Sequence, residues 1–80
     1  MKYVYLLRSL SRPDKRYVGV TSDLRSRLAT HSSGRSPHTS KYCPWQLVTY
    51  ICFRNDRRAI EFERYLKSGS GQGFANKRLW

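Results

Sequence analysis

The chain has 80 residues, and its 16 lysines and arginines against five acidic residues give a formal net charge of +11. Its hydrophobic fraction of 39% excludes a disordered chain, and its length predicts a single domain over residues 1–80. Neither a long apolar run nor a signal-peptide-like start is present, which excludes a membrane span and predicts a cytoplasmic location. The excess of positive charge favours a polyanionic partner, of which nucleic acid is the commonest.

Two short strands, residues 2–9 and 16–21, are predicted at the start of the chain. Both alternating sets of side chains in the first strand are largely apolar, which is typical of a strand covered on both faces. A turn between them is predicted around Pro13 and its polar neighbours. Tyr17 and Gly19 share one face of the second strand. A glycine weakens a strand unless something must approach it closely, so Gly19 marks a close contact.

A helix is predicted over residues 23–32. Asp23 is a residue type that caps helix N-termini, and Gly34 is a typical stop signal. At about 100° per residue, His31 shares the apolar face with two leucines, and Arg27 lies at the edge of that face. These two polar side chains are therefore expected one turn apart, beside the surface that packs on the sheet.

The segment 32–44 is predicted to be a long loop, and a third strand is predicted over residues 45–54. Strict alternation would place four of its side chains on one face: Leu47, Thr49, Ile51 and Phe53. Val48 and Tyr50 would then lie on the other face. The two cysteines, Cys43 and Cys52, are expected to be free thiols, as is usual in a cytosolic protein.

A second helix is predicted over residues 57–67, with Asn55 or Asp56 as its cap. On a helical wheel Glu63 falls inside the apolar arc, whereas Glu61 falls on the opposite, solvent-facing side. A carboxylate on a buried face is costly unless it is paired, protonated or bound to a cation. Glu63 is therefore a candidate functional residue.

The glycine-rich segment 68–73 is predicted to end this helix, and a short last helix is predicted over residues 74–78. The predicted elements follow the order β-β-α-β-α-α. They describe an α+β fold in which a small three-stranded antiparallel sheet is flanked by helices.

Five segments together resemble the GIY-YIG nuclease superfamily. Tyr3-Val4-Tyr5 and Tyr17-Val18-Gly19 resemble its two naming tripeptides, although the leading glycine of the first is Tyr3 here. Arg27 lies where the family helix carries a catalytic arginine, and His31 lies where a tyrosine or histidine follows four residues on. Glu63 matches the metal-binding glutamate of the later helix. The resemblance covers nearly the whole chain and is closest to small standalone bacterial members.

The resemblance implies a metal-dependent endonuclease that hydrolyses phosphodiester bonds in DNA, with branched or single-stranded structures in repair and recombination as candidate substrates. Glu63 would bind a hydrated Mg²⁺, with Mn²⁺ as an alternative. We favour Tyr17 as the base, because Gly19 on the same face would leave room for a phosphate, and Tyr5 as its supporting partner. Arg27 would clamp the phosphate. The implied catalytic set is Tyr5, Tyr17, Arg27, His31 and Glu63.

Five residues are expected to contact nucleic acid: Gly19, Arg25, Arg35, Lys41 and Lys67. Asn76 is an open counterpart of an asparagine that the family often carries after the glutamate helix. Two alternatives stand beside the nuclease reading. The chain could be a non-catalytic nucleic-acid-binding module, or a nuclease subunit that needs a protein partner. The oligomeric state is not predicted.

Overall fold

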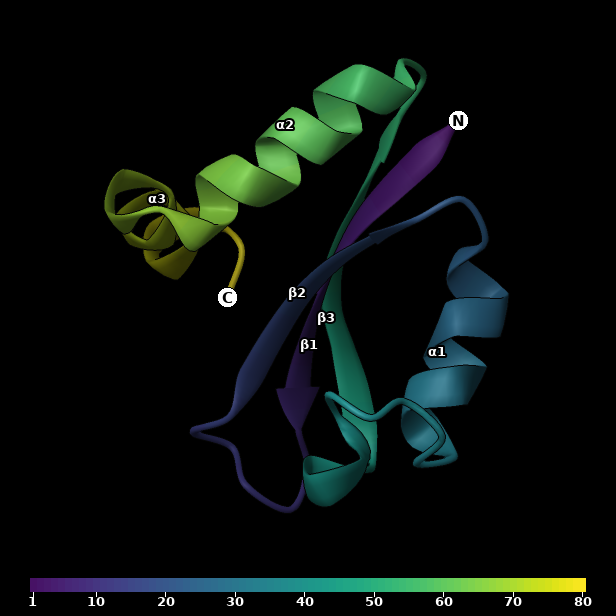
Figure 1. Ribbon diagram of the computed structural model, residues 1–80. Helices are drawn as coiled ribbons and strands as arrows, with labels where there is room; N and C mark the ends of the chain where they lie inside the picture. The colour runs from purple at the N-terminus through teal and green to yellow at the C-terminus, as the bar shows by residue number, and fades with distance from the viewer.

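The computed structural model describes residues 1–80 and contains a three-stranded antiparallel sheet with helices on both faces (Figure 1). The strands are β1 (Lys2–Ser9), β2 (Arg16–Thr21) and β3 (Trp45–Phe53). The helices are α1 (Leu24–Ser32), α2 (Asp56–Lys67) and α3 (Gly69–Arg78), with a short 3-10 helix at Ser40–Tyr42. The predicted order β-β-α-β-α-α and the α+β fold class are confirmed.

The central strand of the sheet is β1, because the strand order is β2-β1-β3. One face of β1 presents Val4 and Leu6 to a core that includes Ala59 of α2 and Ala75 of α3. The other face presents Tyr5 and a neighbouring leucine to a second core beside α1. All of these β1 side chains are fully buried. The prediction of a strand covered on both faces is therefore confirmed, and each face carries its own core.

The predicted alternation of β3 is wrong, because the strand contains a β-bulge. Leu6 pairs with Thr49, whereas the next residue, Leu7, pairs with Leu47, so Val48 is an extra residue in the ladder. An extra residue moves the side chains before it to the opposite face. Accordingly Leu47 packs in the core beside α1, while Phe53 packs in the core beside α2.

The start of α1 agrees with the sequence, because the Asp23 carboxylate accepts a hydrogen bond from the backbone N–H of Ser26 at 3.1 Å. The cap of α2 is Asn55, whose side chain accepts from the N–H of Arg58 at 3.1 Å. Capping side chains satisfy N–H groups that have no partner in the first helical turn.

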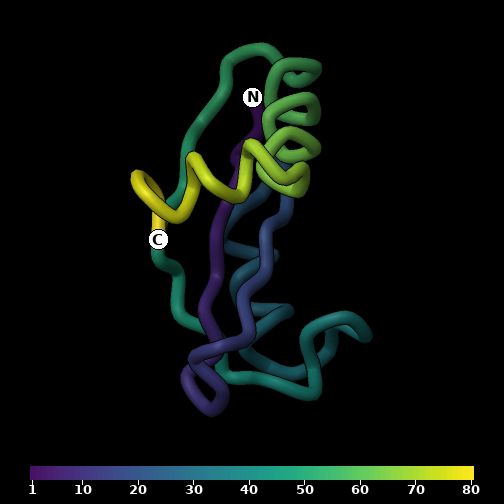
Figure 2. The backbone as a smooth tube through the Cα atoms, turned by 90° about the vertical axis from the view of Figure 1, so that its left-hand side faces the viewer, coloured from purple at the N-terminus to yellow at the C-terminus, as the bar shows by residue number.

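The glycine-rich segment 68–73 ends α2 as predicted, since α2 stops at Lys67, but the prediction that the last helix begins at residue 74 is wrong. This segment forms the first turns of α3, and Ser68 caps it by accepting from the N–H of Gly71 at 3.2 Å. A Cβ atom at Gly71 would collide with the backbone carbonyl of Tyr65, so glycine there lets the two helices meet closely. Figure 2 shows α3 turning sharply away from α2 and running across the sheet. This packing outweighs the low helix propensity of glycine.

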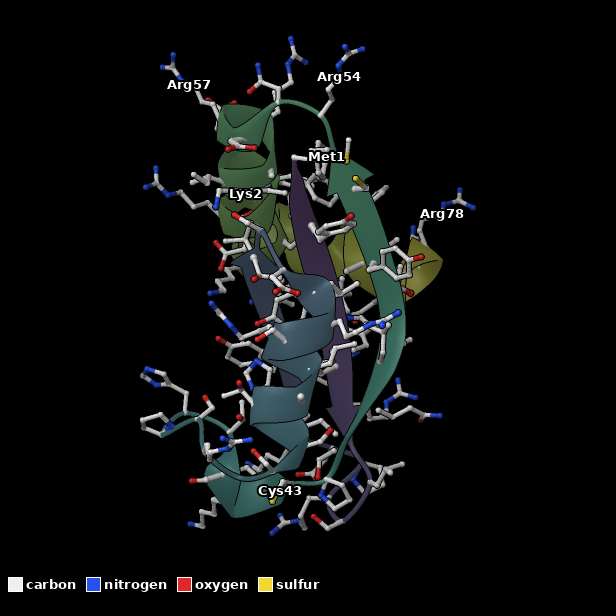
Figure 3. All side chains as sticks on the ribbon, turned by 90° about the vertical axis from the view of Figure 1, so that its right-hand side faces the viewer. Met1, Lys2, Cys43, Arg54, Arg57 and Arg78 are labelled. Carbon is white, nitrogen blue, oxygen red and sulfur yellow. The ribbon has the colours of Figure 1, made fainter.

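The surface carries the charge that the sequence predicts. Exposed arginines point away from the body, among them Arg54, Arg57 and Arg78 (Figure 3). Both cysteines are free, as predicted. None of the helices is both long enough and apolar enough to cross a membrane.

Candidate active site

A buried chain of hydrogen bonds joins β1, α1 and the loop after α1. Tyr5 Oη and His31 Nε2 are 2.9 Å apart, and His31 Nδ1 is 2.6 Å from the hydroxyl oxygen of Thr39. The exposed fraction of these three side chains is at most 1%. Trp45 Nε1 donates to the backbone carbonyl of Thr39 at 2.9 Å and so fixes the loop. The histidine is held at both ring nitrogens, which sets its orientation.

Tyr17 lies against this chain from the neighbouring strand β2. Its ring centroid is 5.0 Å from that of His31 and 6.2 Å from that of Tyr5. Unlike Tyr5, it is only half-buried. The structure therefore brings together the two tyrosines and the histidine that the sequence selected, and leaves Tyr17 as the more accessible tyrosine.

Gly19 makes the close contact that its strand position predicts, and its neighbour in the structure is the Tyr5 side chain. Gly19 is buried opposite Tyr5 in the β1–β2 register. A Cβ atom there would lie 2.5 Å from both Cζ and Oη of Tyr5 and 2.9 Å from Cε2 of Tyr17. The tip of the Tyr5 side chain therefore fills the space beside Gly19 on this face, which gives Gly19 a packing role; its contact with nucleic acid stays a prediction.

The burial of this site controls its ionisation. Burial raises the pKa of Tyr5 to about 12; the neighbouring Tyr17 adds to the shift, and the Arg27 guanidinium opposes it. Burial also lowers the pKa of His31, and the positive charge of Arg27 lowers it further. Each shift favours the neutral form. Arg27 thus belongs electrostatically to the Tyr5–His31 pair, while its exposed position leaves it accessible to a ligand.

Glu63 lies on α2, on the other side of the sheet from α1, and the structure explains its place on the apolar arc. Its side chain is only 14% exposed, and Lys67 one helical turn later places its ammonium nitrogen 2.6 Å from Glu63 Oε2. The charge is therefore paired, which is one of the ways in which a carboxylate on a packing face is tolerated.

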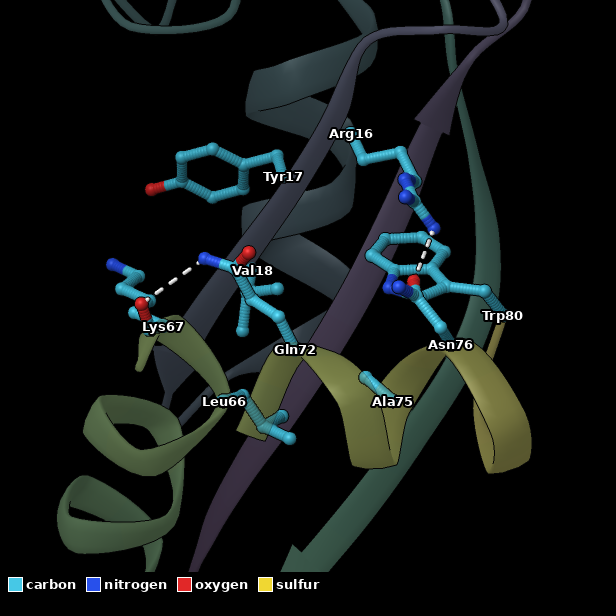
Figure 4. Close-up of a pocket in the computed structure, with 9 residues that line it drawn as sticks. All are labelled: Arg16, Tyr17, Val18, Leu66, Lys67, Gln72, Ala75, Asn76 and Trp80. Atoms are coloured by element: carbon cyan, nitrogen blue, oxygen red, sulfur yellow. Dashed lines mark hydrogen bonds between the residues drawn. The ribbon is translucent and has the colours of Figure 1, made fainter. Parts of the chain in front are cut away.

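A cleft of about 380 Å³ connects Lys67 to Tyr17 along β2 and α3 (Figure 4). Tyr17 and Lys67 lie at one end of it, and Arg16, Asn76 and Trp80 lie at the other. Arg16 Nη1 donates to Asn76 Oδ1 at 3.2 Å. Asn76, whose role the sequence left open, is thus part of the cleft. Glu63 does not line the cleft itself, but its ion-pair partner Lys67 does. Glu63 makes no hydrogen bond to the Tyr5–His31–Thr39 chain.

The remaining predicted nucleic-acid contacts are exposed cations on separate segments. Arg25 is on α1, Arg35 follows α1, and Lys41 is in the 3-10 helix. The structure does not gather them with Lys67 into one cluster. The nitrogen of Lys41 lies 5.7 Å from the ring centroid of Tyr42. These side chains can contribute to a positive surface; Arg35 Nε donates to Ser33 Oγ at 2.9 Å, and Arg25 lines a separate cleft beside α1.

Sequence reasoning missed the roles of Thr39, Arg16 and Lys67 in these arrangements. Thr39 lies in an irregular loop, where no periodicity predicts which side chain turns inward. The position of Arg16 beside Asn76 depends on the packing of α3. The Glu63–Lys67 pair did have a signal, because a glutamate four residues before a lysine is a favourable helical spacing.

Comparisons with known proteins show which proteins this chain is similar to. A family model described as the GIY-YIG catalytic domain matches residues 1–78. A UPF0213 protein of Streptococcus pyogenes serotype M3 is 33% identical over 66 residues, which cover 81% of this chain and 70% of that protein. A UPF0213 protein of Bacillus pumilus is 38% identical over 53 residues, covering 65% of this chain and 54% of that protein.

A solved structure is also similar. The solution NMR structure of a UPF0213 protein from Bacillus halodurans matches with a TM-score of 0.57 and 27% sequence identity. The match covers 96% of this chain and 84% of that one. The similarity therefore extends over all the elements that carry the candidate site.

Proposed function

Since this chain belongs to the GIY-YIG family of catalytic domains, we propose that it is a divalent-metal-dependent endonuclease that hydrolyses phosphodiester bonds in DNA. Branched or single-stranded DNA formed during repair and recombination is the substrate class that we favour. The observation that carries the proposal is the convergence of Tyr5, Tyr17 and His31. The positive charge of Arg27 also acts on the pKa of Tyr5 and of His31.

The donor set at Glu63 fits a hydrated Mg²⁺. The described residues contain no cluster of three or more His, Cys, Asp or Glu side chains that could hold a metal. Mg²⁺ in phosphoryl-transfer sites, however, often binds through one or two carboxylates, several waters and the substrate phosphate. The Lys67 ammonium lies 2.6 Å from Glu63 Oε2, so a metal ion bound at that oxygen would take its place. When bound, Mg²⁺ or Mn²⁺ would stabilise negative charge on the phosphate and the leaving oxygen.

The other side chains of the site would have separate catalytic roles. Tyr17, which is half-buried and lines the cleft, would orient the attacking water and accept its proton. Tyr5 is unsuited to that task because burial raises its pKa to about 12. Tyr5 and His31 would instead form the rigid support for the Tyr17 ring. Arg27 would donate hydrogen bonds to the phosphate oxygens.

A cleavage assay on labelled branched, flap and single-stranded DNA tests the proposal. We expect cutting that requires Mg²⁺ or Mn²⁺ and stops on chelation. Glu63→Gln should lower the rate on the order of 100-fold or more, because it removes a charge that acts on the transition state. Glu61→Gln is the matched control, because Glu61 is on the same helix but 62% exposed. Equal rates for the two variants would contradict the proposed role of Glu63.

The charge of +11 also supports a second candidate, a nucleic-acid-binding module without catalysis. Such a module would bind DNA with an affinity that falls steeply with salt, yet would cut none of the substrates. A nuclease subunit that depends on a protein partner would gain cutting activity only when that partner is added. The same assay, repeated with cell extract, separates these outcomes.

A further inference from the structure

We propose that Arg16, at the end of the cleft away from Tyr17, binds a backbone phosphate that flanks the scissile one. The inference deepens the proposed function and rests on it, because it assigns a second contact to the same DNA strand. The observation is a preorganised arginine without a carboxylate partner, at the end of the cleft opposite the one that Tyr17 and Lys67 line (Figure 4).

Arg16 is exposed but is held in place by two contacts. Its guanidinium carbon lies 4.7 Å from the ring centroid of Trp80, and its Nη1 donates to Asn76 Oδ1 at 3.2 Å. Stacking on an aromatic ring leaves the edge of the guanidinium free for hydrogen bonding. Only one of its five N–H donors is used by a side chain, so a planar fork remains available for phosphate oxygens.

No carboxylate side chain pairs with Arg16. The ion pairs of the structure engage Asp14, Asp56, Glu61 and Glu63, and none of them involves Arg16. The fifth acid, Asp23, caps α1. Arg8, which is opposite Arg16 in the β1–β2 register, also lies over Trp80, with its guanidinium carbon 5.8 Å from the ring centroid. Two guanidinium groups at one indole ring make a site that favours an anion.

The cleft connects the Arg16 site to Tyr17. Its lining between the two ends includes apolar side chains of β2, α2 and α3: Val18, Leu66 and Ala75. Asn76, whose Oδ1 accepts from Arg16, keeps its amide N–H groups available as further donors beside the guanidinium. A strand laid along the cleft can therefore meet the Tyr17 end and the Arg16 end with different phosphates. Arg16 would act by fixing the register of the strand, since phosphate contacts position a protein on nucleic acid.

Binding of a short single-stranded DNA to the Glu63→Gln protein tests the inference without requiring cleavage. We expect Arg16→Gln in this background to weaken binding about tenfold at low salt. The slope of log K against log salt should become shallower by about 0.7, as for one lost contact to a single strand. Arg57→Gln is the matched control, because Arg57 is 89% exposed near the start of α2 and carries the same charge. Arg16→Lys should keep the slope, because it keeps the charge.

A scan with single uncharged methylphosphonate linkages locates the phosphate. A methylphosphonate at one position of the DNA should weaken its binding to the protein with Arg16, but should not change its binding to the Arg16→Gln variant. Inorganic phosphate alone should compete with the DNA only at high concentration. An equal effect of Arg16→Gln and Arg57→Gln, or a scan in which no linkage is coupled to Arg16, would overturn the inference. These readouts measure binding only, so they stay separate from a failure of the proposed nuclease activity in the cleavage assay.

Discussion

Gly19→Ala should destabilise the protein by forcing apart the two tyrosines of the candidate site. The added Cβ would lie 2.5 Å from Cζ and Oη of Tyr5, a distance that real Cβ atoms do not reach. Tyr5 is fully buried and held by His31, so it cannot turn aside freely. Overpacking of this kind costs about 1–3 kcal/mol, and disturbing a buried hydrogen bond adds about 1 kcal/mol or more. We therefore expect a loss of about 2–4 kcal/mol.

Urea unfolding followed by tryptophan fluorescence measures this loss, and Gly73→Ala provides the control. Gly73 lies within α3, and nothing lies within 4 Å of a Cβ built there. Because alanine has the higher helix propensity, Gly73→Ala should stabilise the protein by about 0.5–1 kcal/mol. The two glycine-to-alanine changes should thus have opposite signs.

A double-mutant cycle tests the cause. If the clash with the Tyr5 ring is responsible, Gly19→Ala should cost less than about 1 kcal/mol in a Tyr5→Leu background, because the shorter side chain leaves room for the new methyl group. The reasoning is refuted if Gly19→Ala stays within about 0.5 kcal/mol of the parent protein. It is also refuted if the cost is the same in both backgrounds.

Two further predictions concern His31 and its partners. Because the pKa of His31 is lowered in the folded state, the unfolded chain takes up a proton first as the pH falls below about 6.5. The free energy of unfolding should therefore decrease from pH 7 towards pH 5, and His31→Gln should remove that part of the slope in urea titrations; an unchanged slope would count against a neutral, buried histidine. Thr39→Val should cost about 1–3 kcal/mol by leaving His31 Nδ1 without its partner, whereas Thr39→Ser should be nearly neutral. Equal unfolding free energies for these two variants would show that the hydroxyl is not needed.

Much of the fold follows from local patterns in the sequence. The bounds of β1 and β2 agree with the prediction, and Asp23 and Asn55 cap their helices as their residue types suggest. These features depend on alternation, capping and turn residues within a few positions of each other. The contact of Tyr5 with His31 was also foreseeable, because one strand and one helical face suffice to place them.

Other features depend on contacts between residues far apart in the sequence, so no local sequence pattern predicts them. The bulge at Val48 arises from the pairing of β3 with β1, and the start of α3 depends on the close approach of Gly71 to α2. Gly19 was correctly recognised as a close contact, but the sequence could not say that the neighbour is Tyr5. Thr39 was missed because it lies in a loop held by Trp45 from the next strand.

The bulge in β3 divides one strand between the two cores. After Val48, the side chain of Phe53 packs in the core beside α2. Before Val48, the side chain of Leu47 packs in the core beside α1. Regular pairing of β3 with β1 at the same chain length would put Val48 opposite Leu7 and turn Leu47 to the face of the α2 core. The extra residue is therefore what keeps Leu47 in the core that contains Tyr5. The candidate site thus depends on an irregularity in a strand that contributes both Trp45 and Leu47 to the core beneath it.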